Sequence, residues 1–478
     1  MLKRRDFGLM RNKMKNMFER SPPDTIGERR RITQLLLWAC VVVLLWVAAT
    51  PLVGSSGYGL SLGRYRIDLN VYRIGSQAWL HGVGLYGPLP ATAIGVRLPF
   101  SYPPISAVLL SPLSLVPMAV ASAALTLISI ALLAVVLHVF MRSLSAAHVK
   151  SRWHVRWLLP VALLLEPVRN TLNYGQINVI LMMLVSVDCL YRRPSRTRGA
   201  LVGIAAAIKL TPMAFILYFL VQKDYRAACM AGISFIGCTC VGFLLAWRDS
   251  VQYWTSIIFQ PSRDGGVAYA ANQSIQGVLS RAGVNMSSTA GTTLWLGLSL
   301  VAVILAYAGM RRARSKKLDA WVLSLNALAA LLISPISWSH HWVWAELAIL
   351  ALVLISWRSR DKVGLAVAFT GTVILAVAPQ WLMQARDPND LTWAAWEQVV
   401  GSSYVILAVV ILVFSATFAR WRQAPPSSGE EPLPEAGQHV MTRTLRLTEH
   451  RRRPERLPPA HRLARVSIPA CLATARRG

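Results

Sequence analysis

The sequence predicts an all-α integral membrane protein that crosses the bilayer many times. Apolar residues make up 54% of its 478 residues, and charged residues make up only 15%. Apolar runs recur along the chain, and each is long enough, at about 20 residues, to span the hydrocarbon core as a helix. Charge is concentrated at the two ends and in short basic loops between these runs. We therefore expect a polytopic helical protein with about 10–13 membrane segments.

Charge divides the chain into three parts. Residues 1–31 hold ten Lys and Arg against four Asp and Glu, and residues 421–478 hold eleven against five. We interpret the first part as a basic cytoplasmic segment and the second as a disordered basic cytoplasmic tail, because it has no sustained helical period. The membrane domain is expected between them, over 32–420. Since no base-reading module accompanies the basic charge, we expect membrane lipids and no nucleic acid as partners.

The asymmetry of Lys and Arg between loops sets the expected orientation. The basic start stays inside, so the first span, 32–53, runs outward and is retained rather than cleaved. Residues 54–100 are then outside, and a proline-broken piece precedes the second span. The remaining spans are expected at 120–141, 157–168, 177–191, 199–222, 227–247, 294–310, 318–333, 342–357, 363–381 and 399–418.

The first external segment holds a single carboxylate, Asp68, among cationic side chains. The arginines beside it are Arg64, Arg66 and Arg73. A short amphipathic helix is expected at 69–81, lying along the bilayer surface. A lone acid beside cations at a membrane surface is a candidate site; the alternative is an Asp that caps a surface helix.

A lysine interrupts the apolar stretch 199–222, which begins and ends at basic clusters that should both be inside. An even number of crossings in so few residues predicts a broken hairpin, with the break at 209–212. Lys209 is then at the hairpin tip. Because a lysine is costly in hydrocarbon, we expect it to face a cavity or an anion. The alternative is a lysine that snorkels from a lipid-facing helix.

Charge counting places the scattered polar residues on one external face. They are Asp68, Tyr102, Asn173, Gln176, Asn178, Asn272, Gln273, His340 and His341. We expect them to share an extracytoplasmic cavity. The alternatives are amides that cap helices or bond between them, and a histidine pair that anchors the interface beside neighbouring tryptophans.

These residue types suit transfer of a sugar. Asp68 is a candidate general base toward a sugar hydroxyl, and His340 or His341 can share that work or donate to a departing phosphate. Lys209 and a nearby arginine can balance the phosphate charge. The amides suit sugar hydroxyls. The sequence has no Walker motif, dinucleotide turn, zinc spacing or DxD motif, which favours a lipid-linked sugar donor over a nucleotide.

Several short motifs occur in an order that resembles the actinobacterial mannosyltransferases of glycosyltransferase family 87. The resemblance extends over roughly 30–420 and leaves only the two tails. Its motifs are Asp68–Arg73, Leu98–Pro104, Tyr174–Asn178, Lys209–Pro212, Asn272–Ser274, Ser334–Pro335 and His340–His341.

The resemblance implies a GT-C fold with its active site facing the periplasm. It also implies polyprenyl-phosphate mannose as donor, and an α-(1→2) linkage formed with inversion because the donor sugar is β-linked. Asp68 matches the catalytic acid of the family, and neither a metal nor a cofactor is expected. The implied acceptors are mannolipids: phosphatidylinositol mannosides, lipomannan or lipoarabinomannan. The run 68–104 is more similar to enzymes that branch lipomannan than to the enzyme that elongates phosphatidylinositol mannosides.

Other functions stay open on the sequence. A related enzyme could use polyprenyl-phosphate arabinose, since sugar selectivity depends on a few hydrogen bonds. A transporter or flippase of a lipid-linked glycan is a second alternative. It is disfavoured because the polar clusters lie toward one face and the halves show no internal repeat. A structural scaffold would leave Asp68, Lys209 and the histidine pair unexplained.

Overall fold

The computed structural model describes residues 65–146, 155–191, 195–260, 263, 265–383 and 393–417. Within these ranges the chain is helical and forms no β-strand, apart from an isolated bridge between Asn272 and Trp338. The expected first span, the two tails and Arg64 lie outside the described residues.

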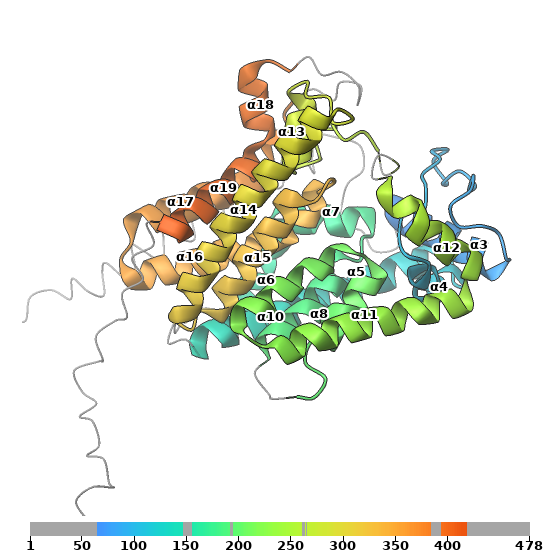
Figure 1. Cartoon of the computed structure of the whole chain (residues 1–478), viewed down its shortest axis with the longest axis horizontal. Helices are drawn as coiled ribbons and strands as arrows, with labels where there is room; N and C mark the ends of the chain where they lie inside the picture. Colours follow the sequence, from blue (N-terminus) through green and yellow to red (C-terminus); the bar gives the residue numbers. More distant parts are fainter. Residues whose placement is uncertain are drawn as a thin grey trace, which may run out of the picture. The chain divides into compact units, whose positions relative to one another are not determined.

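Helices follow one another throughout the described ranges (Figure 1). In chain order they are α3 (Ile67–Leu80), α4 (Pro104–Ser114), α5 (Met118–Ala146), α6 (Val155–Leu164), α7 (Glu166–Tyr174), α8 (Asn178–Leu190), α9 (Ala200–Ile208), η1 (Thr211–Phe215), α10 (Ile216–Gln222), α11 (Tyr225–Leu245), α12 (Trp247–Thr255), η2 (Ile257–Phe259), α13 (Ile275–Arg281), α14 (Thr289–Ser315), α15 (Asp319–Ile333), η4 (Ser339–Trp342), α16 (Val343–Ser359), α17 (Lys362–Val377), η5 (Pro379–Trp381), α18 (Ala395–Gly401) and α19 (Ser403–Thr417).

The chain is a multi-pass membrane protein. Among the described residues, five helices are long and apolar enough to cross a membrane, and the bent pair α18 and α19 makes a sixth candidate. The five are Met118–Ser145, Tyr225–Leu245, Thr289–Ser315, Ser339–Ser359 and Lys362–Trp381. Other expected spans correspond to apolar helices of 10–17 residues. The expectation of an all-α polytopic protein is confirmed, although several spans are broken rather than continuous.

Two expected spans are interrupted. The expected span 157–168 is divided at Leu165 between α6 and α7, because Pro167 opens a new helix there. Helix α7 continues to Tyr174, beyond the end of the expected span. The connection to α8 is therefore only the three residues 175–177. The last expected span, 399–418, is bent by 67° between α18 and α19.

The broken hairpin at 199–222 is confirmed. Helix α9 ends before Lys209, and η1 with α10 returns the chain toward its start. The base of the hairpin is closed by an ion pair between Arg198 Nη1 and Asp224 Oδ2 at 3.3 Å. Lys209 is the residue after the last one of α9, so it lies at the tip.

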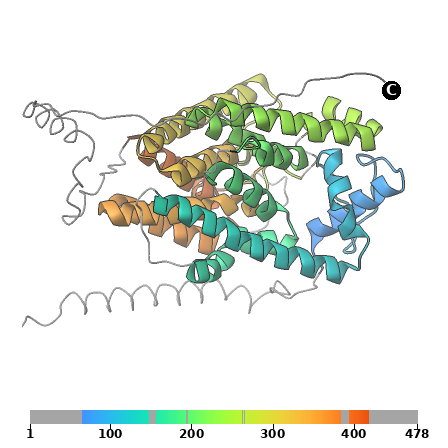
Figure 2. The same cartoon turned by 90° about the horizontal axis from the view of Figure 1, so that it is seen from below.

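Helix α3 forms close to the expected 69–81, but its apolar face packs on protein rather than along the bilayer. Val71 and Ala78 are buried in one cluster with Tyr253 and Ile257 of the α12–η2 segment. Trp79 Nε1 donates to the carbonyl of Leu245, the last residue of α11, at 3.0 Å. In both views α3 and α4 lie together at one end of the long helices (Figures 1 and 2).

The core is centred on α15. Twelve of its side chains are buried, from Ala320 to Leu332, which fits a helix that is apolar on all sides. In contrast, only 11% of the apolar window of α11 is buried inside the protein, so this helix offers most of its surface to lipid. The long helices therefore enclose a packed interior and carry the loops that form the site at their ends.

Candidate functional site

A cavity of about 590 Å³ lies where several loops between the helices meet. Its lining comes from α3, the segment before α4, the α7–α8 turn, the α9–η1 break and the loops that precede α13 and α16. The structure brings six of the residues expected from sequence into this lining: Asp68, Tyr102, Gln176, Lys209, His340 and His341. Asp68 in α3 and His341 in η4 are the two of these residues that lie furthest apart in the sequence. The fold therefore assembles the cavity from distant segments of the chain.

The Asp68 carboxylate is oriented by a buried amide. Asp68 lies in the first turn of α3, and its Oδ2 accepts a hydrogen bond from Gln176 Nε2 at 2.7 Å. Gln176 Oε1 accepts from the Tyr72 hydroxyl at 2.6 Å, which fixes which end of the amide faces Asp68. The Tyr72 and Tyr102 hydroxyls are 3.1 Å apart. Burial raises the pKa of Tyr72 well above its usual range, so it stays a neutral donor.

The turn before α8 makes this contact possible. Gly175 has φ +72°, a conformation that L side chains rarely adopt. A Cβ at this position would lie 2.9 Å from Leu69 Cβ and 3.0 Å from Arg66 Cβ. Only glycine allows the turn to approach α3 this closely, and the approach brings Gln176 to Asp68. The capping alternative for Asp68 is not supported, because Arg66 is the N-cap of α3.

The two described arginines beside Asp68 are directed away from the cavity. The buried Arg66 donates from Nε to Ser122 Oγ at 2.8 Å and from Nη1 to the carbonyl of Leu172. Arg73 Nη1 donates to the carbonyl of Val116 at 2.6 Å and to that of Leu113. Neither lines the cavity. These contacts anchor α3 to its neighbours, so the expectation that Arg66 and Arg73 bind substrate finds no geometric support.

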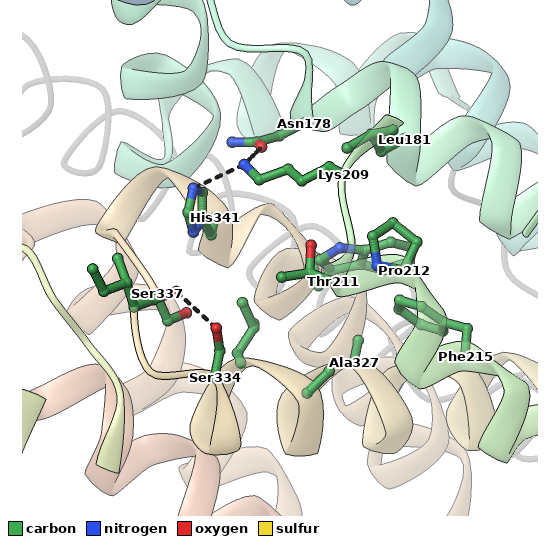
Figure 3. Close-up of a pocket in the computed structure, with 14 residues that line it drawn as sticks. Asn178, Leu181, Lys209, Thr211, Pro212, Phe215, Ala327, Ser334, Ser337 and His341 are labelled. Atoms are coloured by element: carbon green, nitrogen blue, oxygen red, sulfur yellow. Dashed lines mark hydrogen bonds between the residues drawn. The ribbon is translucent and has the colours of Figure 1, made fainter. Parts of the chain in front are cut away.

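Lys209 and His341 meet at the inner end of the cavity (Figure 3). Lys209 Nζ lies 3.1 Å from His341 Nε2 and 3.3 Å from Asn178 Oδ1. It also lies 5.4 Å from the centroid of the Tyr102 ring, within cation–π range. A smaller pocket of about 50 Å³, lined in part by η1 and α15, adjoins the same two residues. The cation is therefore held at one place by Asn178 Oδ1 and the Tyr102 ring, and the snorkelling alternative is not supported.

The tautomer of His341 follows from its backbone contact. Its Nδ1 lies 3.2 Å from the backbone nitrogen of Trp338, which can only donate. A neutral His341 therefore carries its ring proton on Nε2, facing Lys209. The ring is consequently a hydrogen-bond donor at this end of the cavity and not a base.

His340 is held differently from its neighbour. Its carbonyl accepts from Thr171 Oγ1 at 2.8 Å and from Asn178 Nδ2 at 2.9 Å. Its buried ring packs edge-on to Tyr174, with centroids 5.1 Å apart, and to His341 at 4.7 Å. Both histidines line the cavity, and His341 Nε2 lies 3.1 Å from Lys209 Nζ, so the geometry favours His341 at the charged end.

The remaining amides act mainly as supports. Asn178 joins Lys209 to the His340 carbonyl and lies beside the smaller pocket. Asn272 is fully buried and accepts from the Ser337 backbone nitrogen at 2.9 Å. Gln273 is also fully buried, and its Nε2 donates to the carbonyl of Gly401 at 2.6 Å. Neither of the last two lines the large cavity, and nor does Asn173. The alternative of bonding between segments fits Asn272 and Gln273.

Sequence reasoning missed several residues of the lining. Tyr72 lies four residues after Asp68 on the same helix face, a spacing that could have revealed it. Further missed residues come from segments whose proximity only the fold creates, among them Arg263, Tyr269, Trp338 and Trp381. Among the described residues, no group of three or more His, Cys, Asp or Glu could hold a metal ion; the expectation of a metal-free reaction stays a prediction.

Comparison with known proteins identifies close relatives. A family model described as glycosyltransferase family 87 matches residues 100–335. A polyprenol-phosphate-mannose-dependent alpha-(1-2)-phosphatidylinositol mannoside mannosyltransferase of Mycobacterium tuberculosis is 36% identical over 86% of this chain and 98% of its own. The protein of the same name from Mycolicibacterium smegmatis is 35% identical, over 84% and 93% of the two chains. A phosphatidylinositol pentamannoside mannosyltransferase of M. tuberculosis is 29% identical, over 85% and 91%. No solved structure matches.

Proposed function

Because this chain belongs to glycosyltransferase family 87, we propose that it transfers mannose from polyprenol-phosphate mannose to a phosphatidylinositol mannoside, forming an α-(1→2) linkage. The chain is a membrane glycosyltransferase, and its curated relatives are named for this donor and this acceptor class. The observation that carries the assignment to the cavity is the convergence of Asp68, Lys209 and His341 on one space. The alternatives of an arabinose donor or a flippase have no comparable support.

The acceptor is proposed from the names of the relatives. Two relatives are named for phosphatidylinositol mannoside and two for phosphatidylinositol pentamannoside, and identity is higher with the first pair. The expected likeness to enzymes that branch lipomannan stays a prediction, as does the use of lipoarabinomannan.

In the proposed reaction Asp68 is the general base. Its carboxylate takes the proton of the acceptor 2-hydroxyl while the hydroxyl oxygen attacks C1 of the donor mannose. The C1–O bond to phosphate breaks in the same displacement, so the β-linked donor gives an α-linked product. The bond from Gln176 and the Tyr72 hydroxyl behind it support this role, because they hold the carboxylate in one orientation.

Lys209 and His341 are proposed to receive the leaving phosphate. Lys209 Nζ and the Nε2–H of a neutral His341 lie 3.1 Å apart, so one acceptor atom can bind both donors. A phosphate oxygen bound at this point accepts from both. Negative charge grows on that oxygen as the C1–O bond breaks, so both contacts strengthen toward the transition state.

We also propose that the cavity faces the periplasm and that both termini are cytoplasmic. Helix α14 follows α13, whose preceding loop lines the cavity, and ends at the basic run Arg311–Lys317. Helix α16 begins at the histidine pair and ends at Arg358 and Arg360. Basic residues thus follow the helix ends that lie away from the cavity, which supports an external cavity by the positive-inside rule. The membrane domain over 32–420 is then the catalytic domain, between two cytoplasmic tails.

The test is an assay of purified protein with polyprenyl-phosphate mannose and a panel of mannolipid acceptors. Asp68→Asn keeps the shape of the side chain but removes the base, and should lower turnover by about 10²–10⁴-fold with donor binding retained. Asp361→Asn is the matched control, since Asp361 caps α17 and Asn is an equally good cap. Normal turnover by Asp68→Asn would exclude it as the base. If wild type transferred arabinose and not mannose, the donor assignment would be wrong.

A further inference from the structure

One side of the cavity is aromatic and has no part in the chemistry proposed above. Tyr269, Trp338 and Trp381 all line the cavity, and we call them the aromatic wall. The ring centroids of Tyr269 and Trp338 are 6.0 Å apart, and those of Tyr269 and Trp381 are 6.2 Å apart. The three rings therefore form one continuous apolar surface, with Tyr269 in contact with both tryptophans.

The wall is built at the ends of the membrane helices. Tyr269 precedes α13, Trp338 lies between α15 and η4, and Trp381 is the last residue of the candidate span that begins at Lys362. Tryptophans at such positions commonly anchor a protein at the lipid headgroups. These three line the cavity, which an anchoring role does not explain.

Buried polar side chains fix the wall in place. Glu166 is fully buried, and its Oε1 accepts from Trp381 Nε1 at 2.7 Å. Its Oε2 accepts from the Tyr404 hydroxyl, also at 2.7 Å. The buried Arg281 donates from Nη1 to the carbonyl of Tyr269 at 3.1 Å. Since the rings are held before any ligand arrives, little conformational entropy is lost on binding.

We propose that the aromatic wall binds the C–H face of a mannopyranose ring, and that Glu166 is a positioning residue that sets the angle of Trp381. This inference rests on the proposed function, because it assumes that the cavity holds mannose. One face of a pyranose is a patch of C–H groups that packs against the negative face of an aromatic ring, while its hydroxyls need polar partners. Gln260 and Arg263 line the same cavity and supply such partners. The ring belongs either to the donor or to the acceptor, which have the same chemistry.

The first experiment separates these two sources by steady-state kinetics. Trp381→Leu removes the aromatic face and should raise KM for one lipid substrate about tenfold, the factor that about 1.4 kcal/mol gives, with kcat changed much less. A higher KM for polyprenyl-phosphate mannose assigns the wall to the donor, and a higher KM for the mannolipid assigns it to the acceptor. Trp381→Phe keeps an aromatic face and should stay closer to wild type. Trp357→Leu is the matched control, because Trp357 is 62% exposed at the far end of α16.

The positioning role of Glu166 has its own variant. Glu166→Gln keeps the volume of the side chain but replaces one acceptor oxygen by a donor, so Trp381 Nε1 or the Tyr404 hydroxyl loses its present partner. We expect KM for the same lipid to rise, by less than in Trp381→Leu, with kcat retained. A variant that lowers kcat alone, or that changes both KM values equally, would contradict a positioning role.

A binding measurement tests the wall without turnover. Saturation-transfer NMR with methyl α-D-mannopyranoside should show transfer to the C–H protons of one sugar face in wild type and Trp357→Leu, and a clear loss in Trp381→Leu. If wild type transfers mannose but Trp381→Leu leaves both KM values and the NMR signal unchanged, the wall proposal is overturned and the proposed function stands. If wild type transfers no mannose and shows no sugar signal, both fail. A signal without transfer supports the wall and refutes the proposed reaction.

Discussion

Replacing Lys209 by Met tests whether the hairpin tip receives the leaving phosphate. Met has an unbranched side chain of similar reach but neither charge nor N–H donors. Lys209 Nζ donates to Asn178 Oδ1 at 3.3 Å and faces His341 Nε2 at 3.1 Å, so the ammonium occupies one place in the cavity (Figure 3). The substitution therefore removes a donor from a defined point rather than from a mobile surface chain.

The magnitude follows from the contact that would be lost. A hydrogen bond from a charged group to an oxygen contributes about 1.5–3 kcal/mol. Since about 1.4 kcal/mol changes a rate tenfold, kcat should fall about 10- to 150-fold. The product polyprenyl phosphate carries the same phosphate, so its inhibition constant should rise in the variant. The KM of the mannolipid acceptor should change little, because the acceptor hydroxyl is activated at Asp68.

The assay measures initial rates at saturating acceptor, with and without added polyprenyl phosphate. Lys316→Met serves as control, because Lys316 is exposed after the end of α14 and outside the cavity. A kcat within twofold of wild type would refute a phosphate-binding role for Lys209. A large loss of kcat with an unchanged inhibition constant would show that Lys209 acts elsewhere in the reaction.

Three further substitutions test the supports of the site. Tyr72→Phe removes the 2.6 Å bond to Gln176 Oε1 and should lower kcat about 3- to 10-fold, measured in the transfer assay, while thermal stability stays close to wild type. Gly175→Ala places a Cβ 2.9 Å from Leu69 Cβ at φ +72°, so the apparent melting temperature in detergent should fall and activity with it; an unchanged melting temperature would contradict the need for glycine. Arg66→Met leaves Ser122 Oγ and the Leu172 carbonyl without this donor and should cost about 1–3 kcal/mol of stability, seen as earlier thermal unfolding, with wild-type stability as the contrary result.

The sequence was sufficient for the parts of the site that depend on sidedness. Counting basic residues between apolar runs placed Asp68, Gln176 and the histidine pair on one face, and these residues do share the cavity. The hairpin tip was predictable because an even number of crossings was required between two basic clusters. These inferences need only the succession of apolar runs and basic loops along the chain, and the free-energy cost of placing a charge in hydrocarbon.

The directions of individual side chains could not be predicted from the sequence. Arg66 and Arg73 neighbour Asp68 along the chain, but a long guanidinium side chain can reach carbonyls several residues away, and both do so. Asn272 and Gln273 were expected to face the cavity, and instead they satisfy backbone groups of loops distant in sequence. Which amide meets a sugar and which meets a carbonyl depends on tertiary contacts.

Helix continuity was also only partly predictable. Pro167 at the start of α7 was visible in the sequence, yet a twelve-residue run still suggested one short span. The bend between α18 and α19 has no proline to signal it. The bend falls at Gly401 and Ser402, whose carbonyl and hydroxyl accept from Gln273 Nε2 and Arg281 Nη2, and this Gly-Ser pair is a local signal for it.

Through the contacts of Arg66, the position of the Asp68 carboxylate depends on how α5 and α7 pack. Arg66 is two residues before Asp68, and its guanidinium is held by Ser122 of α5 and Leu172 of α7. A change in bilayer thickness that tilts α5 against α7 would therefore be passed to the carboxylate. Because a displacement of about 1 Å can cost a reaction 10²-fold, the rate of this enzyme should depend on the acyl-chain length of the lipids around it.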